Sequence, residues 1–294
     1  MNRKKFLHTS LLGAGSLLLP SFASCDDSTE PTQPNPTPVL IIGAGMAGLA
    51  AAQHLKSKNF TNVTLLEARD RIGGRINTNH SLNTPFDMGA SWIHGAGSNN
   101  PITSVADKAN AQTFATNDES LVVYNAQGNL IDDNTLDNYY EQYLNLLESV
   151  ADAATTNKSV AQVINELNPL LLNDLIMQYQ LSTYAEFDAG GSIDQLSSKY
   201  WEDDEAFAGN DVLFPNGYDA ITNYLANGLN IEQQTIVNGI NYTNTEVIVN
   251  TNMGTFNANY VLCTVPLGVL QNNAIQFTPP LSAAHQQAIT KLKM

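Results

Sequence analysis

The stretch that decides the fold is Val39-Leu40-Ile41-Ile42-Gly43-Ala44-Gly45-Met46-Ala47-Gly48. Its first four residues are apolar, as a buried parallel strand requires, and the alanine-rich residues 49–55 that follow are typical of a helix. Between them, Gly43 permits a tight turn, Gly45 lets a pyrophosphate approach the backbone, and Gly48 lets the helix pack close to the strand. The stretch therefore predicts a βαβ unit that binds a dinucleotide.

A second apolar run, Val63-Thr64-Leu65-Leu66, ends in Glu67, which lies 19 residues after Gly48. An acidic side chain at this spacing can accept hydrogen bonds from ribose hydroxyls. The N–H groups of Met46 and Ala47 would face the phosphates, because a helix N-terminus carries a partial positive charge. The alternative is an ordinary βαβ unit with a glutamate on its surface.

The next segment is Ala68-Arg69-Asp70-Arg71-Ile72-Gly73-Gly74-Arg75. Such a glycine-arginine loop suits a second contact with phosphate, and Arg75 is the best candidate for a bidentate grip on phosphate oxygens. A solvated basic turn is the alternative. A third block follows as Phe86-Asp87-Met88-Gly89-Ala90-Ser91-Trp92-Ile93-His94-Gly95.

Together, these three blocks resemble the flavin-containing amine oxidases. Within that family, the sequence from Gly89 to Gly95 is most similar to the polyamine and spermine oxidases, and the monoamine oxidases and histone lysine demethylases are related. The resemblance implies an α/β fold, in which a mainly helical substrate domain is inserted into a Rossmann-like FAD-binding domain. It also implies FAD as the cofactor, because an NAD-only site does not account for the glycine-arginine loop or for the third block.

The resemblance further implies which residues contact the cofactor and the substrate. The FAD contacts in the first part of the chain would be Gly43, Gly45, Met46, Ala47, Gly48, Glu67, Ala68, Arg69, Gly74, Arg75, Met88, Gly89, Ala90, Ser91 and Trp92. Later in the chain they would be Val237, through its backbone and the adenine, Thr264 and Pro266. His94 would lie near the bound amine, and a histidine satisfied inside its own loop is the alternative.

The domain boundaries follow from the same comparison. We expect residues 38–97 and 213–281 to form the FAD-binding domain, 98–212 the inserted helical domain, and 282–294 the start of a second substrate-domain segment. Three apolar stripes recur at helical spacing in the insertion: Leu136, Tyr140, Tyr143, Leu144, Leu147 and Val150; Val160, Val163, Ile164 and Leu167; and Leu171, Leu175 and Tyr179. Strands are predicted at residues 236–242, 246–250 and 255–258, and residues 260–270 are predicted to be a buried strand that runs into a turn, with Cys263 as a buried packing residue.

The N-terminus is typical of an export signal, which we assign to residues 1–25. A basic start that resembles a weakened twin-arginine signal precedes an apolar core at residues 11–19, and small residues precede Cys25. We expect lipid on Cys25 to anchor an exported protein, with plain cleavage to a soluble periplasmic or secreted protein as the alternative. Residues 26–37 form a proline-rich linker, so the folded part is expected to begin at about Val39.

The formal net charge of −15 argues against nucleic-acid binding, because phosphate would be repelled. It favours a small cationic substrate, although an acidic exported protein would carry the same charge. The five histidines have no metal-ligand spacing, so no metal site is predicted. With Cys25 lipidated or removed, one cysteine remains and no disulfide is expected.

The resemblance implies that this sequence is the N-terminal part of a longer enzyme, with the family's lysine lying beyond Met294. The implied reaction is oxidation of the C–N bond of a polyamine or other amine, with hydride transfer to flavin N5 and reoxidation by O2 to H2O2. Such a reaction needs no nucleophile or acid–base dyad in the protein. The alternatives are an FAD-dependent L-amino-acid oxidase, and an inactive, truncated surface lipoprotein that retains the fold.

Overall fold

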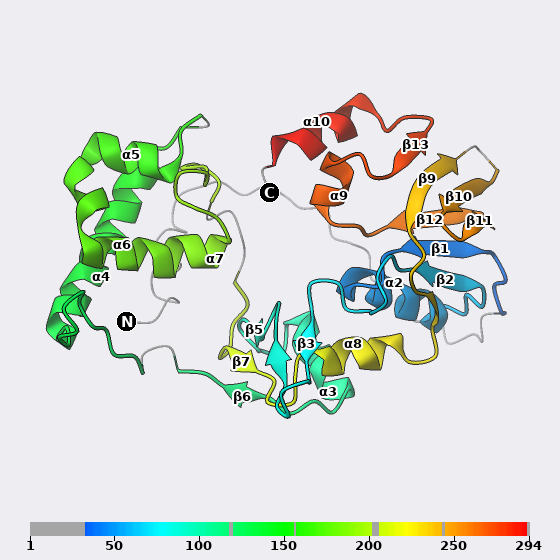
Figure 1. The fold of residues 1–294 in the computed structure, drawn as a ribbon, viewed down its shortest axis with the longest axis horizontal. Helices are drawn as coiled ribbons and strands as arrows, with labels where there is room; N and C mark the ends of the chain where they lie inside the picture. The colour runs from blue at the N-terminus through cyan, green and yellow to red at the C-terminus, as the bar shows by residue number, and fades with distance from the viewer. Residues whose placement is uncertain (1–32, 118–119, 156, 202–205, 243–244, 293–294) are drawn as a thin grey trace. The chain divides into compact units, whose positions relative to one another are not determined.

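The computed structural model describes residues 33–117, 120–155, 157–201, 206–242 and 245–292 (Figure 1). The predicted signal segment, with Cys25, and the first part of the predicted linker lie outside the described residues.

Backbone pairing begins at Asn35, before the predicted start of the fold at Val39. The Asn35 N–H donates to the Asn59 carbonyl at 2.7 Å, and the Thr61 N–H donates to the Asn35 carbonyl at 2.9 Å. The prolines around Asn35 favour an extended backbone, which leaves its N–H and carbonyl available for this pairing. The end of the proline-rich segment is therefore attached to the loop that follows α2.

A four-stranded parallel sheet is the centre of the nucleotide-binding region. Its order is β12 (Tyr260–Cys263), β1 (Val39–Ile42), β2 (Val63–Leu66) and β8 (Asn230–Glu232). Helix α2 (Met46–Ser57) connects β1 to β2, as Figure 1 shows in blue. The predicted strand, glycine turn and helix are therefore confirmed, and the structure is a mixed α/β fold with a parallel sheet.

Strand β1 is buried on both faces because its side chains alternate between two cores. Leu40 and Ile42 pack in one cluster with residues of a second sheet, among them Val249. Val39 and Ile41 pack in the other cluster with α2 and with α8 (Asp219–Ala226). This two-sided burial explains why the strand is apolar at every position.

The second sheet has the order β11 (Gly254–Ala258), β10 (Val247–Thr251), β9 (Val237–Tyr242) and β13 (Gln276–Thr278). The first three strands are antiparallel neighbours and agree with the predicted strands to within one residue. Strand β13 pairs with β9 in parallel. The sequence patterns predicted neither β13 nor β8, each of which has only three residues.

Two-residue strands tie the third sequence block to distant segments. Strand β7 (Val212–Leu213) pairs with both β5 (Trp92–Ile93) and β6 (Phe114–Ala115), and β3 (Thr78–Asn79) pairs with β4 (Phe86–Asp87). Helix α3 (Pro101–Lys108) shares a core with β5 and α8 through Ala106, Ile93 and Ile221. The side chain of Asn100, the N-cap of α3, donates to the carbonyls of His94 and Gly95, which places the start of α3 beside the His94 loop.

The helical region contains α4 (Asp133–Asp152), α5 (Val160–Leu167), η1 (Pro169–Asn173), α6 (Leu175–Leu181), η2 (Ser182–Glu186) and α7 (Phe187–Ala189). Its core is formed by Tyr143, Leu146, Leu147, Val150, Val160, Val163, Ile164, Met177 and Leu181. The first two predicted stripes are confirmed as helices. The third is wrong as a single buried face, because Asp174 caps a new helix between Leu171 and Leu175, and Leu175 is 67% exposed.

The last part of the chain forms α9 (Leu267–Gln271) and α10 (Ala283–Lys291). The prediction that Cys263 is buried is wrong: Cys263 is exposed, because β12 is an edge strand of the parallel sheet. Within the described residues, every helix is too short or too polar to cross a membrane.

Candidate functional site

Two glycines of the turn are required by the packing of the protein itself. A Cβ on Gly48 would lie 2.0 Å from the Gly43 carbonyl oxygen, closer than any real contact. Gly43 has a φ of +102°, and a Cβ there would lie 2.9 Å from Oγ1 of Thr264. The Thr264 hydroxyl donates to the Ile42 carbonyl at 2.8 Å and so closes the end of β1. Packing therefore accounts for Gly43 and Gly48 without a ligand.

Gly45 differs from these two glycines. Its φ of −79° suits any residue, and a Cβ would find its nearest neighbours, Cα of Gly74 and the carbonyl oxygen of Gly73, at 3.8 and 3.9 Å. Those are ordinary van der Waals distances, so the protein alone does not require glycine at this position. A ligand that lies against the backbone would require it.

Helix α2 begins directly after Gly45 and is well suited to an anion. Gly45 is the N-cap and supplies no side-chain acceptor, and the first turn contains no acidic residue. The first N–H groups of a helix have no partner within the helix, and they carry the positive end of its dipole. The described residues thus leave the N-terminus of α2 open to a phosphate, at the turn where sequence reasoning placed it.

Glu67 lies directly beside the glycine turn. One carboxylate oxygen, Oε2, accepts the Ala44 N–H at 2.8 Å, and the other, Oε1, accepts the Arg69 N–H at 2.9 Å. The residue is only 7% exposed, so the alternative of a surface glutamate does not hold. Each oxygen can accept a second hydrogen bond, which leaves acceptor capacity for a sugar hydroxyl.

The glycine-arginine loop folds back onto the same turn. The Gly73 N–H donates to the Ala44 carbonyl at 2.9 Å. Gly74 has a φ of +61°, and a Cβ there would lie 3.2 Å from Cα of Gly45. The Arg71 side chain holds the loop by donating to the carbonyls of Ile72, Gly74 and Ile76. Sequence reasoning missed this internal role because three arginines of the loop look alike.

The three arginines of the loop are used differently. Arg71 is tied to loop carbonyls, and Arg69 donates to the Gly74 carbonyl at 3.2 Å. Arg75 is exposed, and among the described residues its guanidinium has neither an ion-pair nor a hydrogen-bond partner. It is therefore the arginine of this loop with a full set of donors to offer a phosphate.

The third block packs against Arg75 through the backbone. A Cβ on Gly89 would lie 1.9 Å from the Arg75 carbonyl oxygen, and the Ala90 N–H donates to that oxygen at 3.3 Å. Ser91 donates to the Gly89 carbonyl, and Met88 is 65% exposed. The structure therefore brings this block to the loop that carries Arg75.

The later predicted contacts enter from the second half of the chain. The Thr235 N–H donates to the Glu67 carbonyl at 2.9 Å, which brings the start of β9 and Val237 beside the end of β2. Thr264 closes the end of β1, and Pro266 is the exposed N-cap of α9. Each predicted cofactor residue remains a prediction. The segments of Val237 and Thr264 do contact the ends of β2 and β1, respectively.

Asp87 is a structural residue that sequence reasoning did not single out. Its carboxylate accepts the Thr78 hydroxyl at 2.5 Å and the Tyr218 N–H at 3.1 Å, so it attaches β4 to the start of α8. Burial, with the nearby Asp87 charge, raises the pKa of Tyr218. The isolated aspartate between Phe86 and Met88 carries no local signal of this role.

His94 lies in an exposed position with one ring nitrogen engaged. Its Nδ1 is 2.8 Å from Oδ2 of Asp211, and the ring stacks on Trp92 with centroids 6.3 Å apart and planes at 19°. Asp211 was not predicted, because 117 residues separate it from His94. The exposed ring agrees with a role in ligand contact, while the Asp211 bond means that the histidine is also held by its surroundings.

Comparison with known proteins assigns the family. The family model described as flavin containing amine oxidoreductase matches residues 46–294. The chain belongs to the flavin-containing amine oxidoreductase family. Its members are FAD-dependent oxidoreductases that act on CH–NH groups, so the family resemblance seen in the sequence is confirmed.

Several curated relatives are about one-third identical to this chain. Probable polyamine oxidase 4 of Arabidopsis thaliana is 33% identical over 275 residues, which cover 86% of this chain and 55% of the relative. Polyamine oxidase 4 of Oryza sativa subsp. japonica is 32% identical, and the match covers 96% of this chain and 60% of the relative. Lysine-specific histone demethylase 2 of Homo sapiens is 32% identical, and the match covers 99% of this chain and 36% of the relative. The chain thus spans little more than half the length of the first two relatives.

The family implies FAD, and the residues of this chain fit that cofactor. A dinucleotide needs a close backbone approach, donors for its phosphates and an acceptor for its ribose. Gly45 allows the first, the N-terminus of α2 and Arg75 supply the second, and Glu67 supplies the third. No described group of three or more His, Cys, Asp or Glu side chains could hold a metal ion.

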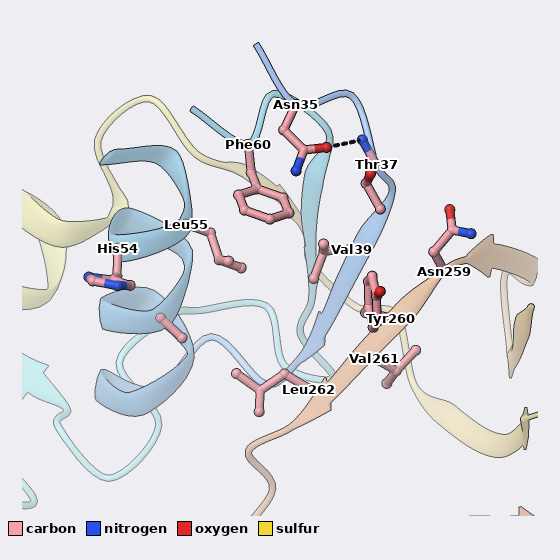
Figure 2. Close-up of a pocket in the computed structure, with 11 residues that line it drawn as sticks. Asn35, Thr37, Val39, His54, Leu55, Phe60, Asn259, Tyr260, Val261 and Leu262 are labelled. Carbon is pink, nitrogen blue, oxygen red and sulfur yellow. Dashed lines mark hydrogen bonds between the residues drawn. The ribbon is translucent and has the colours of Figure 1, made fainter. Parts of the chain in front are cut away.

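An open hollow of about 710 Å³ among the described residues is not this site. Its walls include Val39, Leu55, Phe60 and Tyr260 (Figure 2). Val39 and Tyr260 are the first residues of β1 and β12, whereas the glycine turn follows the last residue of β1. The hollow is thus at the opposite end of the sheet, and none of the predicted cofactor residues lines it.

Proposed function

We propose that this chain is the FAD-binding and amine-contacting part of an oxidase that oxidises the C–N bond of a polyamine or a similar amine. The observation that carries the proposal is the meeting of Gly45, the open N-terminus of α2 and the buried Glu67 at one turn. Family membership and the polyamine oxidases among the relatives support the substrate class.

The architecture is proposed on the same basis. The parallel sheet with α2, α8 and the second sheet would be the Rossmann-like FAD-binding domain, built from residues 38–97 and 213–281. The helices of residues 98–212 would contribute to the substrate domain, and residues 282–294 would begin its next segment. The mixed α/β fold supports this division, since α4, α5 and α6 share a core of their own.

The chain's own residues would bind and orient the cofactor and the amine. The chemistry that bound FAD supplies is acceptance of a hydride equivalent from the amine carbon and return of the electrons to O2 as H2O2. The first turn of α2 would hold the pyrophosphate, and Glu67 would accept from the ribose. His94 would contact the amine, beside Trp92.

A second candidate substrate class is the L-amino acids, and the sequence weighs against it. A carboxylate-bearing substrate calls for a cation in the cavity, and arginine is the best match for a carboxylate. The arginines of this chain are Arg3, Arg69, Arg71 and Arg75, so the inserted region contains none. The net charge of −15 also favours a cationic substrate.

The test is H2O2 release by the FAD-loaded protein that contains this chain, with separate panels of polyamines, monoamines and L-amino acids. We expect peroxide with polyamines or related amines, in amounts equal to the amine consumed. Peroxide with L-amino acids alone would favour the second candidate. A protein that contains this chain and retains FAD, but whose flavin is reduced by no amine, would overturn the oxidase proposal and favour an inactive protein that keeps the fold.

We also propose that the protein is exported and carries lipid on Cys25, with the membrane reached only through that anchor. The basic start, the apolar core and the small residues before Cys25 support this. A cell that expresses the full chain should incorporate a labelled fatty acid into it, and Cys25→Ser should abolish the label. Equal labelling of both would contradict the anchor.

A further inference from the structure

We propose that Asp211 is a positioning residue for His94, and that it fixes the imidazole tautomer that presents Nε2 to the substrate amine. The inference rests on the proposed function, since contact between His94 and the amine is part of it. It adds a residue that lies outside the sequence blocks that suggested the family.

The hydrogen-bond pattern of the Asp211 carboxylate determines the tautomer. Oδ2 is 2.8 Å from Nδ1 of His94, and Oδ1 accepts the Gly95 N–H at 2.7 Å. An ionised carboxylate can only accept, so Nδ1 must be the nitrogen that carries the proton. In a neutral imidazole, Nε2 then has a free lone pair and can accept a hydrogen bond from an ammonium or amine N–H.

The backbone around the pair is held on both sides. Gly95 has a φ of +63°, and a Cβ there would lie 2.0 Å from the Phe207 carbonyl oxygen. The Asn100 side chain donates to the His94 carbonyl at 3.1 Å, and the Thr116 N–H donates to the Asp211 carbonyl at 2.9 Å. The pair therefore joins two segments that are already fixed to each other.

Two further contacts limit the orientation of the ring. Strands β5 and β7 pair Trp92 with Leu213 and Ile93 with Val212, which brings the residues next to these strands together. Trp92 stacks on the His94 ring at an interplanar angle of 19°. With its plane set by Trp92 and its Nδ1 set by Asp211, the imidazole has one edge left for a ligand.

A second pair in the same protein provides an internal control. His80 faces Asp219 through Nε2, at 3.0 Å from Oδ2. By the same reasoning, the His80 proton lies on Nε2, so the two histidines should be opposite tautomers. Each pair has an exposed histidine and a less exposed aspartate, with side-chain exposures of 65% and 24% for His94 and Asp211, and 55% and 25% for His80 and Asp219.

The direct readout is ¹⁵N NMR of the histidine side chains in the full chain at about pH 8. We expect His94 to be protonated on Nδ1 and His80 on Nε2, with His94→Gln and His80→Gln used to assign the signals. Asp211→Asn should move His94 towards a mixture of tautomers and leave His80 unchanged, whereas Asp219→Asn should do the reverse. A wild-type His94 that is protonated on Nε2 would overturn the inference.

The functional readout is a set of steady-state measurements on the FAD-loaded protein that contains this chain. Asp211→Asn, which keeps the shape of the side chain, should lower kcat/KM for the amine about 10-fold, the lower end of what loss of a ligand-orienting partner costs. The effect should fall mainly on KM, and Asp219→Asn should match wild type. In a His94→Gln background, Asp211→Asn should have no further effect, because it acts through the histidine.

The outcomes separate this inference from the proposed function. A wild type that oxidises no amine overturns both. An active wild type with an equally active Asp211→Asn overturns the inference alone, as does an Asp211→Asn effect that persists in full without His94. Circular dichroism and FAD content that match wild type show that the Asp211→Asn protein is folded, and Asp211→Glu provides a second variant if they do not match.

Discussion

The glycine turn and the helical region are stabilised by different kinds of contact. At the turn, the contacts are between backbone atoms: Gly48 packs on the Gly43 carbonyl, and the Gly73 N–H donates a hydrogen bond to the Ala44 carbonyl. In the helical region, side chains of α4, α5 and α6 fill a shared core around Met177. A backbone contact has no side chain to rearrange, whereas a side-chain core can partly relax. Mutations at the turn should therefore weaken FAD binding as well as stability, whereas mutations in the helical core should lower stability and leave FAD affinity unchanged.

Gly48→Ala should have the largest effect. The added Cβ would lie 2.0 Å from the Gly43 carbonyl oxygen, and neither backbone segment can move without opening the junction of β1 and α2. We expect a loss of about 3 kcal/mol or more in the free energy of unfolding, the upper end for overpacking, and no retained FAD. Urea unfolding measures the loss of stability, and flavin absorbance measures the retained FAD.

The control for this change is Gly268→Ala. Gly268 lies in α9, and an added Cβ would meet no atom within 4 Å. Alanine is the better helix former by about 0.5–1 kcal/mol, so this variant should equal or exceed wild type in stability. If Gly48→Ala were as stable as Gly268→Ala and carried as much FAD, the account of the turn would be wrong.

Met177→Ala should be next in size. Met177 is completely buried in the helical core, and truncation of a buried methionine costs about 2–5 kcal/mol. Because the lost contacts lie in the side-chain core, FAD affinity should stay at the wild-type value under conditions where the protein is folded. Thermal or urea unfolding followed by circular dichroism measures the loss of stability, and a flavin titration measures the FAD affinity.

Leu175→Ala in the same helix is the matched control, because Leu175 is 67% exposed. Substitutions at exposed positions usually change stability by less than about 0.5 kcal/mol. Loss of FAD binding in folded Met177→Ala would show that the helical core also determines cofactor affinity, and would contradict the difference between the two regions.

Glu67→Gln would sharpen the comparison within the turn. The carboxylate accepts from both Ala44 and Arg69, and a carboxamide has one oxygen and one NH2, so one of these N–H groups would lose its acceptor. An unsatisfied buried donor costs about 1–3 kcal/mol. Urea unfolding measures this cost. Glu232→Gln, at an exposed residue of the neighbouring strand β8, should be close to wild type. Equal stability of the two variants would contradict the role of the buried carboxylate.

Asp174→Ala should have the smallest effect. Asp174 caps α6 by accepting the N–H groups of Ile176 and Met177. Burial raises the pKa of Asp174, but hydrogen bonds from Met177, the Tyr139 hydroxyl and Ile176 outweigh it, so the pKa lies below the ordinary value. A carboxyl with a lowered folded-state pKa stabilises the protein above its ordinary pKa of about 3.9, and this contribution is lost as the pH falls through the folded-state value.

Loss of this cap should cost about 1 kcal/mol at pH 7, with a smaller difference from wild type below about pH 4. The measurement is urea unfolding of both proteins as a function of pH. Asp137→Ala, at an exposed position inside α4, should not reproduce this pH dependence. A difference that stays constant down to pH 2 would contradict the assigned role of the carboxylate.

Local sequence patterns correctly predicted the segments whose structure depends mainly on residues close to them in the sequence. Strands β1 and β2, helix α2 and the antiparallel strands of the second sheet follow from apolar runs and turn residues. The predicted third helical stripe failed, because the cap at Asp174 divides it, and Cys263 was assigned to a buried strand that is an edge strand. Burial depends on which strands are neighbours, and the sequence pattern does not contain that information.

The candidate site also contains residues that local sequence spacing predicted and residues that it did not. Gly45 and Glu67 lie on one βαβ unit, so their spacing could be compared with a known dinucleotide fingerprint. Asp211 and His94 meet through two-residue strands that are too short to leave a periodic signal. Long-range pairs of this kind became visible only when the chain was folded.

The most direct test of the account is a titration of FAD into the wild-type chain and into Gly45→Ala. Alanine fits the backbone angles and the space at this position, so Gly45→Ala should unfold at the same urea concentration as wild type. It should nevertheless bind FAD at least about 10-fold more weakly, a loss of about 1.4 kcal/mol, because the methyl group would occupy the place of the pyrophosphate. Equal FAD affinity in the two proteins, or a folded wild type that binds no FAD, would contradict the central claim.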